Sequence, residues 1–423
     1  MKAESSATRM PEIRVPAGLT FLGLALGLAA GWLLRGTSTA APVLAVAGPV
    51  GKLWLQALTM TILPLVAALL FNGVVETIAA ARGGTTARRA LGLILGILAA
   101  SAVLGAVLTP LVLKLSPVPA NAAAAIGAQS ADPGPVPGIA DFLASLIPGN
   151  IVAAAAENAM LPVIVFFALF AVASTRLAEA PRRSLAVLFE AIAGAMMVVI
   201  GWVLAVAPVG VFGLAFAVAA SSGGAAIQAL AHYIVIVTCV GGVVFIGGYV
   251  LAIVAGGRTL TGFARALLPA QAVAFSTQSS LASLPAMLVS CRKLGLREST
   301  SEFVLPLAVA LFRSTGPGMN MAVVIYAAHL TGVTLTPAAL AAGALTAFAT
   351  TFGAVSLPGA ISFVTSAGPV AIAMGVPVEP LALLVAVEML PDLMRTIGNV
   401  TMDVAITTVV DRQEDGDLPA TLH

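Results

Sequence analysis

Long apolar segments separated by short polar stretches dominate the chain. A membrane-spanning helix needs about 20 consecutive apolar residues, and each of these segments approaches or exceeds that length. The strands of a membrane barrel would alternate apolar and polar residues instead, and the chain lacks this alternation. The pattern therefore predicts an all-α polytopic membrane protein with eight transmembrane helices, near residues 16–34, 43–78, 87–115, 139–175, 184–217, 228–256, 302–332 and 378–410.

Two further apolar stretches, 262–290 and 336–374, are less regular and resemble each other. Phe275-Ser-Thr-Gln-Ser-Ser-Leu-Ala-Ser-Leu-Pro285 and Phe348-Ala-Thr-Thr-Phe-Gly-Ala-Val-Ser-Leu-Pro358 share Phe, Thr, Ser, Leu and Pro at the same offsets. Ser and Thr clusters that end in Leu-Pro favour a helix that enters the membrane, unwinds and returns. We expect two re-entrant helical hairpins; the alternative is an ordinary helix with a proline kink in each stretch.

The composition excludes an ordinary soluble protein. Only 9% of the 423 residues are charged and 60% are hydrophobic, whereas roughly 25% of the residues of soluble domains are charged. A net charge of +2 does not indicate a nucleic-acid partner. The sequence contains no phosphate-binding loop, dinucleotide fingerprint, metal-ligand spacing or acid–base constellation, so we expect neither an enzyme nor a bound cofactor.

Basic residues set the expected orientation in the membrane. They concentrate in alternate connections between the apolar segments, and such connections are usually cytoplasmic. Both termini are therefore predicted to be cytoplasmic, with tails over 1–15 and 412–423. The residues that carry this signal are Lys2, Arg9, Arg14, Arg82, Arg88, Arg89, Arg176, Arg182, Arg183, Arg258, Arg265, Arg292, Lys293 and Arg297.

The last apolar segment carries a stripe of polar residues. On a helix with about 100° per residue, the four that follow Glu388 fall within about 80° of one another; they are Asp392, Arg395, Asn399 and Asp403. Charges at membrane depth cost at least about 2.5–3.5 kcal/mol each, so the stripe needs a polar interior and partners. Arg395 suits a carboxylate and Asp392 an ammonium group, which favours aspartate or glutamate as the ligand. A structural ion pair is the alternative.

Several ordered motifs resemble the dicarboxylate/amino acid:cation symporter family, which contains the glutamate transporter homologues. The motifs are Leu-Thr-Met-Thr-Ile-Leu-Pro64-Leu-Val, Leu146-Ile-Pro-Gly-Asn150, Ala207-Pro-Val-Gly-Val-Phe212, the two Ser/Thr-rich stretches, and Arg395-Thr-x-x-Asn399-Val-Thr-x-Asp403. The last of these is similar to the most diagnostic stretch of the family. The resemblance covers nearly the whole chain.

The resemblance implies an elevator fold of eight transmembrane helices and two hairpins, in a homotrimer in the inner membrane of a bacterium. It implies a scaffold and trimerisation domain over 16–82 and 139–220. A transport domain over 84–116 and 226–411, with the hairpins at about 262–290 and 336–374, would move against it.

The resemblance also implies roles for individual residues. Arg395 would bind the side-chain carboxylate of the substrate and Asp392 its amino group, and the presence of Asp392 favours an amino acid over succinate or fumarate. Asp403 matches a carboxylate that binds sodium in the family, and we expect Asn399 to contribute to the same site. Apart from the resemblance, we expect Arg313 and Glu388 to influence cation coupling, together with Asn399 and Asp403. The remaining substrate-binding residues would be Ser279, Ser280, Leu357, Thr396 and Asn399.

One motif departs from the family. Counted without gaps from Leu305-Pro-Leu, the family motif N-M-D-G-T falls on Phe312-Arg313-Ser314-Thr315-Gly316. Ser101 is present for the same buried cation site, but the tyrosine expected beside it is missing. Arg313 would place a permanent positive charge where a mobile cation normally sits. We therefore expect reduced or absent sodium coupling, with proton coupling through Glu388 or Asp403 as the next possibility. The alternative is an arginine that reaches the surface or pairs structurally.

The sequence thus predicts a secondary active symporter that imports glutamate or aspartate with H⁺ or Na⁺ as the coupling ion. Within the same class, the alternative is a C4-dicarboxylate symporter. A passive anion pathway, or a sensor or scaffold that does not transport, is the alternative from another class, because the N-M-D-G-T motif is lost.

Overall fold

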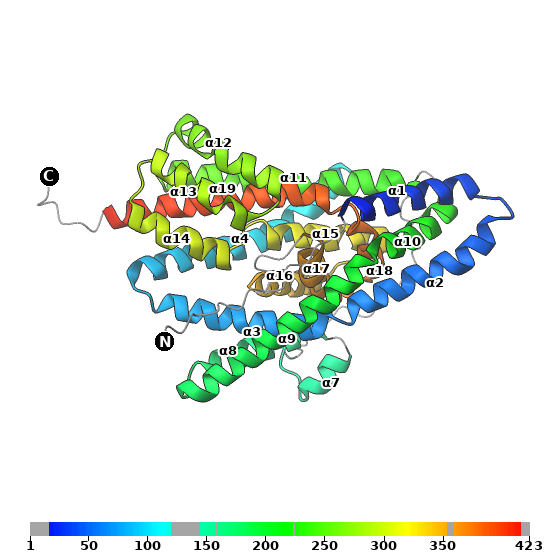
Figure 1. Cartoon of the computed structure of the whole chain (residues 1–423), viewed down its shortest axis with the longest axis horizontal. Coiled ribbons are helices and arrows are strands. Elements are labelled where there is room, and N and C mark those ends of the chain that lie inside the picture. Colours follow the sequence, from blue (N-terminus) through cyan, green and yellow to red (C-terminus); the bar gives the residue numbers. More distant parts are fainter. Residues whose placement is uncertain are drawn as a thin grey trace, which may run out of the picture.

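The computed structural model describes residues 17–119, 144, 146–157, 159–222, 225–352 and 359–415. Every regular element in these ranges is a helix, and the helices form a bundle that is long in one direction (Figure 1). The predicted all-α class is therefore confirmed. The first half contains α1 (Ala17–Leu34), α2 (Ala40–Thr59), α3 (Ile62–Ala81), α4 (Thr85–Leu115), α7 (Ile151–Ala156), α8 (Met160–Ser174), α9 (Glu179–Ala205) and α10 (Ala207–Ser222).

The second half carries most of the polar stripe. It contains α11 (Ala225–Val254), α12 (Leu260–Thr277), α13 (Ser280–Lys293), α14 (Glu298–Leu311), α15 (Gly316–Thr331), α16 (Pro337–Thr351), α17 (Gly359–Ala373), α18 (Glu379–Leu384) and α19 (Met389–Asp415). Four helical stretches among the described residues are long and apolar enough to cross a membrane: 40–81, 85–115, 179–205 and 225–254.

Several segments predicted as single helices are broken in the structure. The segment 302–332 consists of α14 and α15, because Phe312 adopts an extended conformation and Pro317 occupies the first turn of a new helix. The segment 378–410 likewise begins as the short α18, and Glu388 lies in the turn directly before α19. Hydropathy follows the average polarity of a segment and does not detect such interruptions, because a single charged residue at each break, Arg313 or Glu388, changes that average little.

The first irregular stretch is a pair of helices joined by a tight turn. α12 and α13 pack side by side, and Gln278 between them has a left-handed backbone with φ of 50°. Ser279 then caps α13, since its side chain accepts a hydrogen bond from the Ala282 amide at 3.2 Å. A single helix with a proline kink is therefore wrong for this stretch.

The second irregular stretch gives another helix pair, α16 and α17, which also pack against each other. Its predicted tip, including the candidate substrate residue Leu357, falls in 353–358 and lies outside the described residues.

Two helices that are far apart in the sequence run parallel through the bundle. Tyr233, near the start of α11, donates a hydrogen bond to Glu388 at the start of α19. At the other end, Arg412 of α19 donates to the Ala255 carbonyl directly after α11. The two helices therefore lie side by side between these two contacts, and Glu388, directly before α19, lies close to α11.

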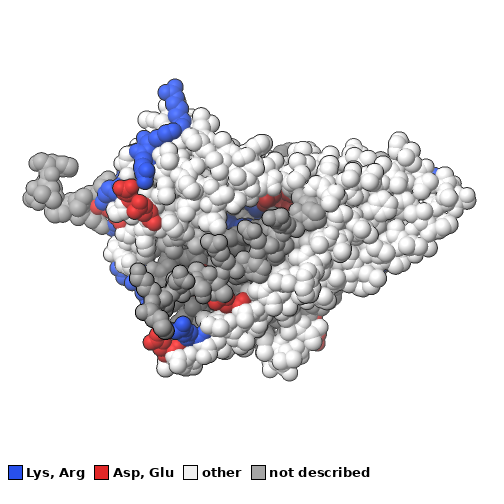
Figure 2. Space-filling view, in the orientation of Figure 1, with Lys and Arg blue, Asp and Glu red and all other residues white. Residues whose placement is uncertain are grey.

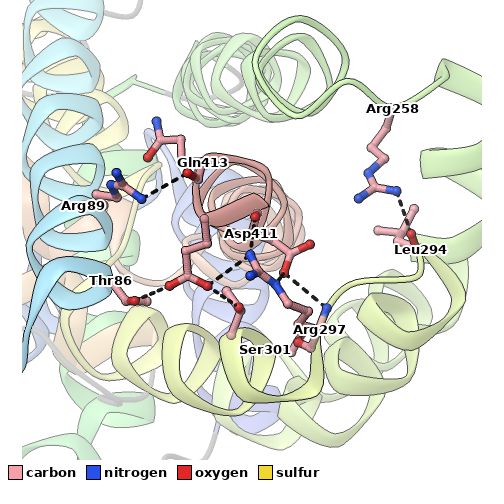
Figure 3. A network of polar contacts seen from close by, with 10 residues as sticks. Thr86, Arg89, Arg258, Leu294, Arg297, Ser301, Asp411 and Gln413 are labelled. Atoms are coloured by element: carbon pink, nitrogen blue, oxygen red, sulfur yellow. Dashed lines mark hydrogen bonds and ion pairs between the residues drawn. The ribbon is translucent and has the colours of Figure 1, made fainter. Parts of the chain in front are cut away.

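A polar network ties the C-terminal end of α19 to neighbouring helices (Figure 3). Arg297, directly before α14, donates from Nε to Asp411 Oδ1 at 3.0 Å and forms an ion pair with Glu414 at 3.1 Å. Arg89 of α4 donates to the Gln413 carbonyl at 3.1 Å. These contacts hold α4, α14 and α19 together at one end of the bundle.

Candidate functional site

The polar stripe predicted on the last apolar segment lies inside the bundle. Glu388, Asp392, Arg395, Asn399 and Asp403 are each at most 5% exposed. The first four of these residues, from Glu388 to Asn399, thus share a buried face over about three helical turns. Asp403 lies about one turn further along α19. Charges that are withdrawn from water in this way need partners, so the contacts of each side chain decide what the site can bind.

Arg395 is held by groups of its own chain. Its Nη2 atom lies 2.6 Å from Glu388 Oε1, and its Nε atom lies 3.4 Å from Asp392 Oδ1. Its Nη1 atom donates to Asn320 Oδ1 at 3.2 Å. The carboxylate of Glu388 therefore occupies one donor of the Arg395 guanidinium, a group that can bind a carboxylate through two donors.

Glu388 has a second partner, because the Tyr233 hydroxyl donates to its Oε2 atom at 2.9 Å. Tyr233 is completely buried, as Glu388 almost is. Neither Tyr233 nor Asn320 was a candidate from the sequence. Both lie in apolar segments without a recognisable motif, and only the packing of α11 and α15 against α19 brings them to the stripe.

Asn399 is fixed by the turn that precedes α15. Its Oδ1 atom accepts hydrogen bonds from Ser314 Oγ at 3.2 Å, Thr315 N at 3.0 Å and Thr315 Oγ1 at 2.9 Å. The backbone donor settles which side-chain atom is the oxygen, since an amide nitrogen could not accept there. The Thr315 hydroxyl has a single hydrogen and also lies 3.1 Å from the Arg395 carbonyl, so it donates to one of these two oxygens at a time. The Thr315 amide and the Ser314 hydroxyl donate to Asn399 Oδ1 in either case, and a cation would have to displace them to be bound by it.

Asp403 is the deepest residue of the stripe. It is completely buried, and neither of its carboxylate oxygens accepts a hydrogen bond from the described residues. The partly buried Arg313, on the turn between α14 and α15, lies close enough for its charge to act on both Asp403 and Asp392. A buried carboxylate without hydrogen bonds is neutralised either by a proton or by a nearby cation, and Arg313 is a cation that the chain itself provides.

Ser101 of α4 was expected to belong to a buried cation site. Its hydroxyl oxygen instead accepts a hydrogen bond from the Gly318 amide at 3.1 Å, in the first turn of α15. That amide would have no partner inside its own helix, so Ser101 serves as a cap in this arrangement. Among the residues that the structure describes, no three His, Cys, Asp or Glu side chains converge as a metal-binding group.

The remaining candidate residues lie on both sides of the stripe. Thr396 donates to the Asp392 carbonyl of its own helix at 3.0 Å. Ser279 and Ser280 are partly buried at the turn between α12 and α13. The neighbouring Gln278 places its Nε2 atom 3.5 Å from the Met389 carbonyl, so this turn lies beside the start of α19. The turn and the stripe therefore border the same region of the bundle.

Charged side chains are unevenly distributed over the surface. In the view of Figure 2 they gather at the end where the C-terminus lies, and the opposite end shows very few. A bundle with apolar outer faces, charges at one end and a buried charged stripe is typical of a helical membrane transport protein.

Comparison with known proteins places the chain within this class. Residues 18–413 match the model of the sodium:dicarboxylate symporter family, and the chain belongs to that family. The resemblance found in the sequence motifs is thereby confirmed.

Characterised relatives have two kinds of substrate in their names. The chain is 31% identical over 280 residues to the proton/glutamate-aspartate symporter of Escherichia coli, which covers 66% of this chain and 63% of the relative. It is 29% identical over 285 residues to C4-dicarboxylate transport protein 1 of Pseudomonas paraeruginosa, covering 66% and 62%. These alignments span slightly less than two thirds of the relatives. A third alignment, to the proton/sodium-glutamate symport protein of Bacillus caldotenax, covers 90% of both chains at 24% identity.

Proposed function

We propose that the protein is a secondary active symporter that imports glutamate or aspartate across the inner membrane of a bacterium. The observation that carries the proposal is the ion pair of Arg395 with Asp392 and Glu388 in one buried site. A guanidinium grips a carboxylate bidentately, and an adjacent carboxylate suits an ammonium group. An acidic amino acid supplies both groups, and the E. coli relative carries glutamate and aspartate in its name.

Glu388 suggests how transport would be coupled to protons. A substrate carboxylate can bind Arg395 Nη2 only after Glu388 has left it, since the two acceptors compete for the same donor. The displaced Glu388 would then be a buried carboxylate with Tyr233 as its remaining partner, and such a charge needs neutralisation. A proton supplies it, so that one proton would travel with each substrate.

The same site offers little to a sodium ion. Sodium prefers oxygen ligands, but Asn399 Oδ1 already accepts hydrogen bonds from the Thr315 amide and the Ser314 hydroxyl, and Gly316 has no hydroxyl where the family motif has threonine. Arg313 adds a permanent positive charge next to Ser314, which contacts Asn399 of the stripe. We infer that sodium coupling is reduced or absent, and that Arg313 takes the place of a mobile cation.

The architecture supports division into a fixed and a moving part. α1, α2 and α10 pack together, as do α3, α8 and α9, whereas α11 to α15 pack with α4 and α19. We propose that 16–82 and 139–220 form a trimeric scaffold, and that 84–116 and 226–411 form a transport domain with two re-entrant hairpins. We also propose eight crossings with both termini in the cytoplasm, because basic residues concentrate in alternate connections and the described end of α19 lies at the charged end of the molecule in Figure 2.

The test is uptake of labelled aspartate by proteoliposomes that contain the purified protein. An imposed pH gradient should drive accumulation, and an imposed Na⁺ gradient should drive little or none. Accumulation that depends strictly on Na⁺ would contradict the coupling. Equilibration without accumulation would instead favour a passive pathway, and no uptake despite binding would favour a sensor.

A C4-dicarboxylate symporter is the second candidate. Asp392 is already flanked by two guanidinium groups, Arg395 at 3.4 Å and Arg313 within electrostatic reach. Because these guanidinium groups of the protein already neutralise Asp392, the site would not require an ammonium group on its substrate. Competition between labelled aspartate and unlabelled succinate separates the two candidates.

A further inference from the structure

A second series of polar residues in contact leads away from Glu388 toward the end of α4. Ser116, which directly follows α4, is exposed, and its hydroxyl oxygen lies 3.0 Å from His232 Nε2. On the other side of the ring, His232 Nδ1 lies 3.2 Å from the hydroxyl of Tyr326 on α15. None of these three residues belongs to the stripe on α19.

The hydrogen bonds define which nitrogen carries the hydrogen when His232 is neutral. The Tyr326 hydroxyl donates to the Ala229 carbonyl at 2.8 Å, so its oxygen is an acceptor toward His232. Nδ1 must therefore carry a hydrogen, and Nε2 accepts from Ser116 in the neutral ring. In this tautomer Nε2 faces the exposed Ser116 and can take up a proton there.

Tyr326 connects His232 with Tyr233, the residue that donates a hydrogen bond to Glu388. Ala229 lies one helical turn before Tyr233, so the Tyr326 hydroxyl points at the turn of α11 that carries Tyr233. The two tyrosine rings pack edge to face with centroids 5.4 Å apart, and both side chains are completely buried. Tyr233 in turn donates to Glu388 Oε2 at 2.9 Å.

We propose that His232, Tyr326 and Tyr233 form the route by which Glu388 exchanges its proton with the exposed end of α4. His232 takes a proton at Nε2 and releases the one at Nδ1 to the Tyr326 oxygen. The Tyr326 hydroxyl turns from the Ala229 carbonyl to Tyr233, which passes its own proton to Glu388. Each oxygen gains one proton as it loses one, so no charge remains on either tyrosine.

The position of the route gives it a direction. α4 has 31 residues and starts beside the C-terminal end of α19, where Arg89 contacts Gln413. At about 1.5 Å per residue, its other end lies about 46 Å away. Protons would thus enter at the end opposite the charged one, which is the extracytoplasmic side in the proposed orientation and the side from which an importer must load.

Few other charged groups face the route. Ser116 and Tyr326 contact the His232 ring from α4 and α15, and Lys114 of α4 is exposed. On α19, Glu388 contacts Tyr233 directly and is itself paired with Arg395. Proton uptake by His232 is therefore separated from the charges of the substrate site by two neutral tyrosines.

The inference rests on the proposed proton coupling and is tested with the full chain in proteoliposomes. Proton uptake on addition of aspartate is followed with a pH dye, and the Kd for aspartate is measured at the same pH. His232→Ala and Tyr326→Phe should each slow proton uptake about tenfold, equivalent to about 1.4 kcal/mol on the transfer barrier, with unchanged Kd. Imidazole in the medium should restore the rate of His232→Ala but not that of Tyr326→Phe.

His329→Ala is the matched control. His329 lies on α15 like Tyr326, is exposed, and lies 2.8 Å from the Ile325 carbonyl of its own helix. The rate of proton uptake by His329→Ala should therefore equal that of the parent protein. Parent-like rates in His232→Ala and Tyr326→Phe would overturn the route while leaving proton coupling intact. A matching loss of affinity, or no rescue by imidazole, would show a structural role and also overturn it. Aspartate accumulation without proton uptake by the parent protein would overturn the coupling and the route together.

Discussion

The carboxylate of Glu388 and the guanidinium of Arg395 lie 2.6 Å apart, and both side chains are almost completely buried. They are seven residues apart in the sequence, which is about two helical turns, so one face of the chain presents both. The pair neutralises the buried Arg395 within the protein itself. A substrate that binds Arg395, as we propose, would have to compete with Glu388, which leads to the first prediction.

Replacing Glu388 by Gln should tighten aspartate binding and abolish its coupling to protons. The amide is a poorer acceptor than a carboxylate, so the substrate gains what Glu388 loses. A hydrogen bond to a charged group contributes about 1.5–3 kcal/mol, which corresponds to roughly 10- to 100-fold in Kd. Binding titrations between pH 5 and 8 would measure this, and pH-driven accumulation should be lost.

Glu379→Gln is the control for that experiment, because Glu379 is exposed in the first turn of α18. It should bind and accumulate aspartate as the parent protein does. Unchanged affinity and intact pH-driven accumulation in Glu388→Gln would remove Glu388 from the coupling mechanism.

Replacing Arg313 by Met should make the protein respond to sodium. Asp403 would lose its nearby cation, and an uncompensated buried charge costs about 3–5 kcal/mol. A sodium ion could then recover part of that loss. We expect a lower Tm in KCl than that of the parent protein, and a rise in Tm when NaCl replaces KCl.

The double variant Arg313→Met/Asp403→Asn tests the pairing directly. It removes both charges, so the sodium response should vanish and much of the stability should return. If Arg313→Met has the Tm and the uptake of the parent protein and does not respond to sodium, Arg313 neither neutralises Asp403 nor takes the place of a mobile cation.

Replacing Asp392 by Asn should weaken binding of aspartate more than binding of succinate. Only the amino acid carries an ammonium group that requires the carboxylate. Loss of one partner of a buried charged pair typically costs about 2–5 kcal/mol. Displacement of labelled aspartate by both compounds gives the ratio of affinities, and an equal loss for both would favour the C4-dicarboxylate alternative.

Replacing Arg297 by Gln should destabilise the end of the bundle that Figure 3 shows. Asp411 is only 3% exposed and would lose its ion pair, while Arg297 itself is 34% exposed. We therefore expect the lower end of the cost for a broken buried pair, about 3 kcal/mol. Thermal unfolding in detergent would register this as a lower Tm.

The matched control is Arg292→Gln. Its ion pair with Glu298 lies on the surface, with side chains 62% and 66% exposed. Such pairs contribute about 0–1 kcal/mol, so its Tm should change little. Equal effects of the two substitutions would show that the Asp411 network adds no particular stability.

The sequence and the structure agree best where a property is local. The spacing of Asp392, Arg395 and Asn399 on one face follows from the helical period alone, and they are buried as expected. The interruption between α12 and α13 was legible from its Ser-rich composition. The breaks at Phe312 and before α19 could not be predicted, because the few residues at each break change the average hydropathy of a long apolar segment little.

By itself, the sequence determined the all-helical membrane class, the family, and the set of charged residues on one face of the last helix. Those properties depend on composition, motif order and a fixed helical period. Only the tertiary structure decided which partners these polar side chains have. Tyr233 donates a hydrogen bond to Glu388, Arg395 donates to Asn320, and the turn before α15 donates to Asn399. The physical reason is that a helix sets the direction of its own side chains, whereas contacts across helices depend on how the helices pack.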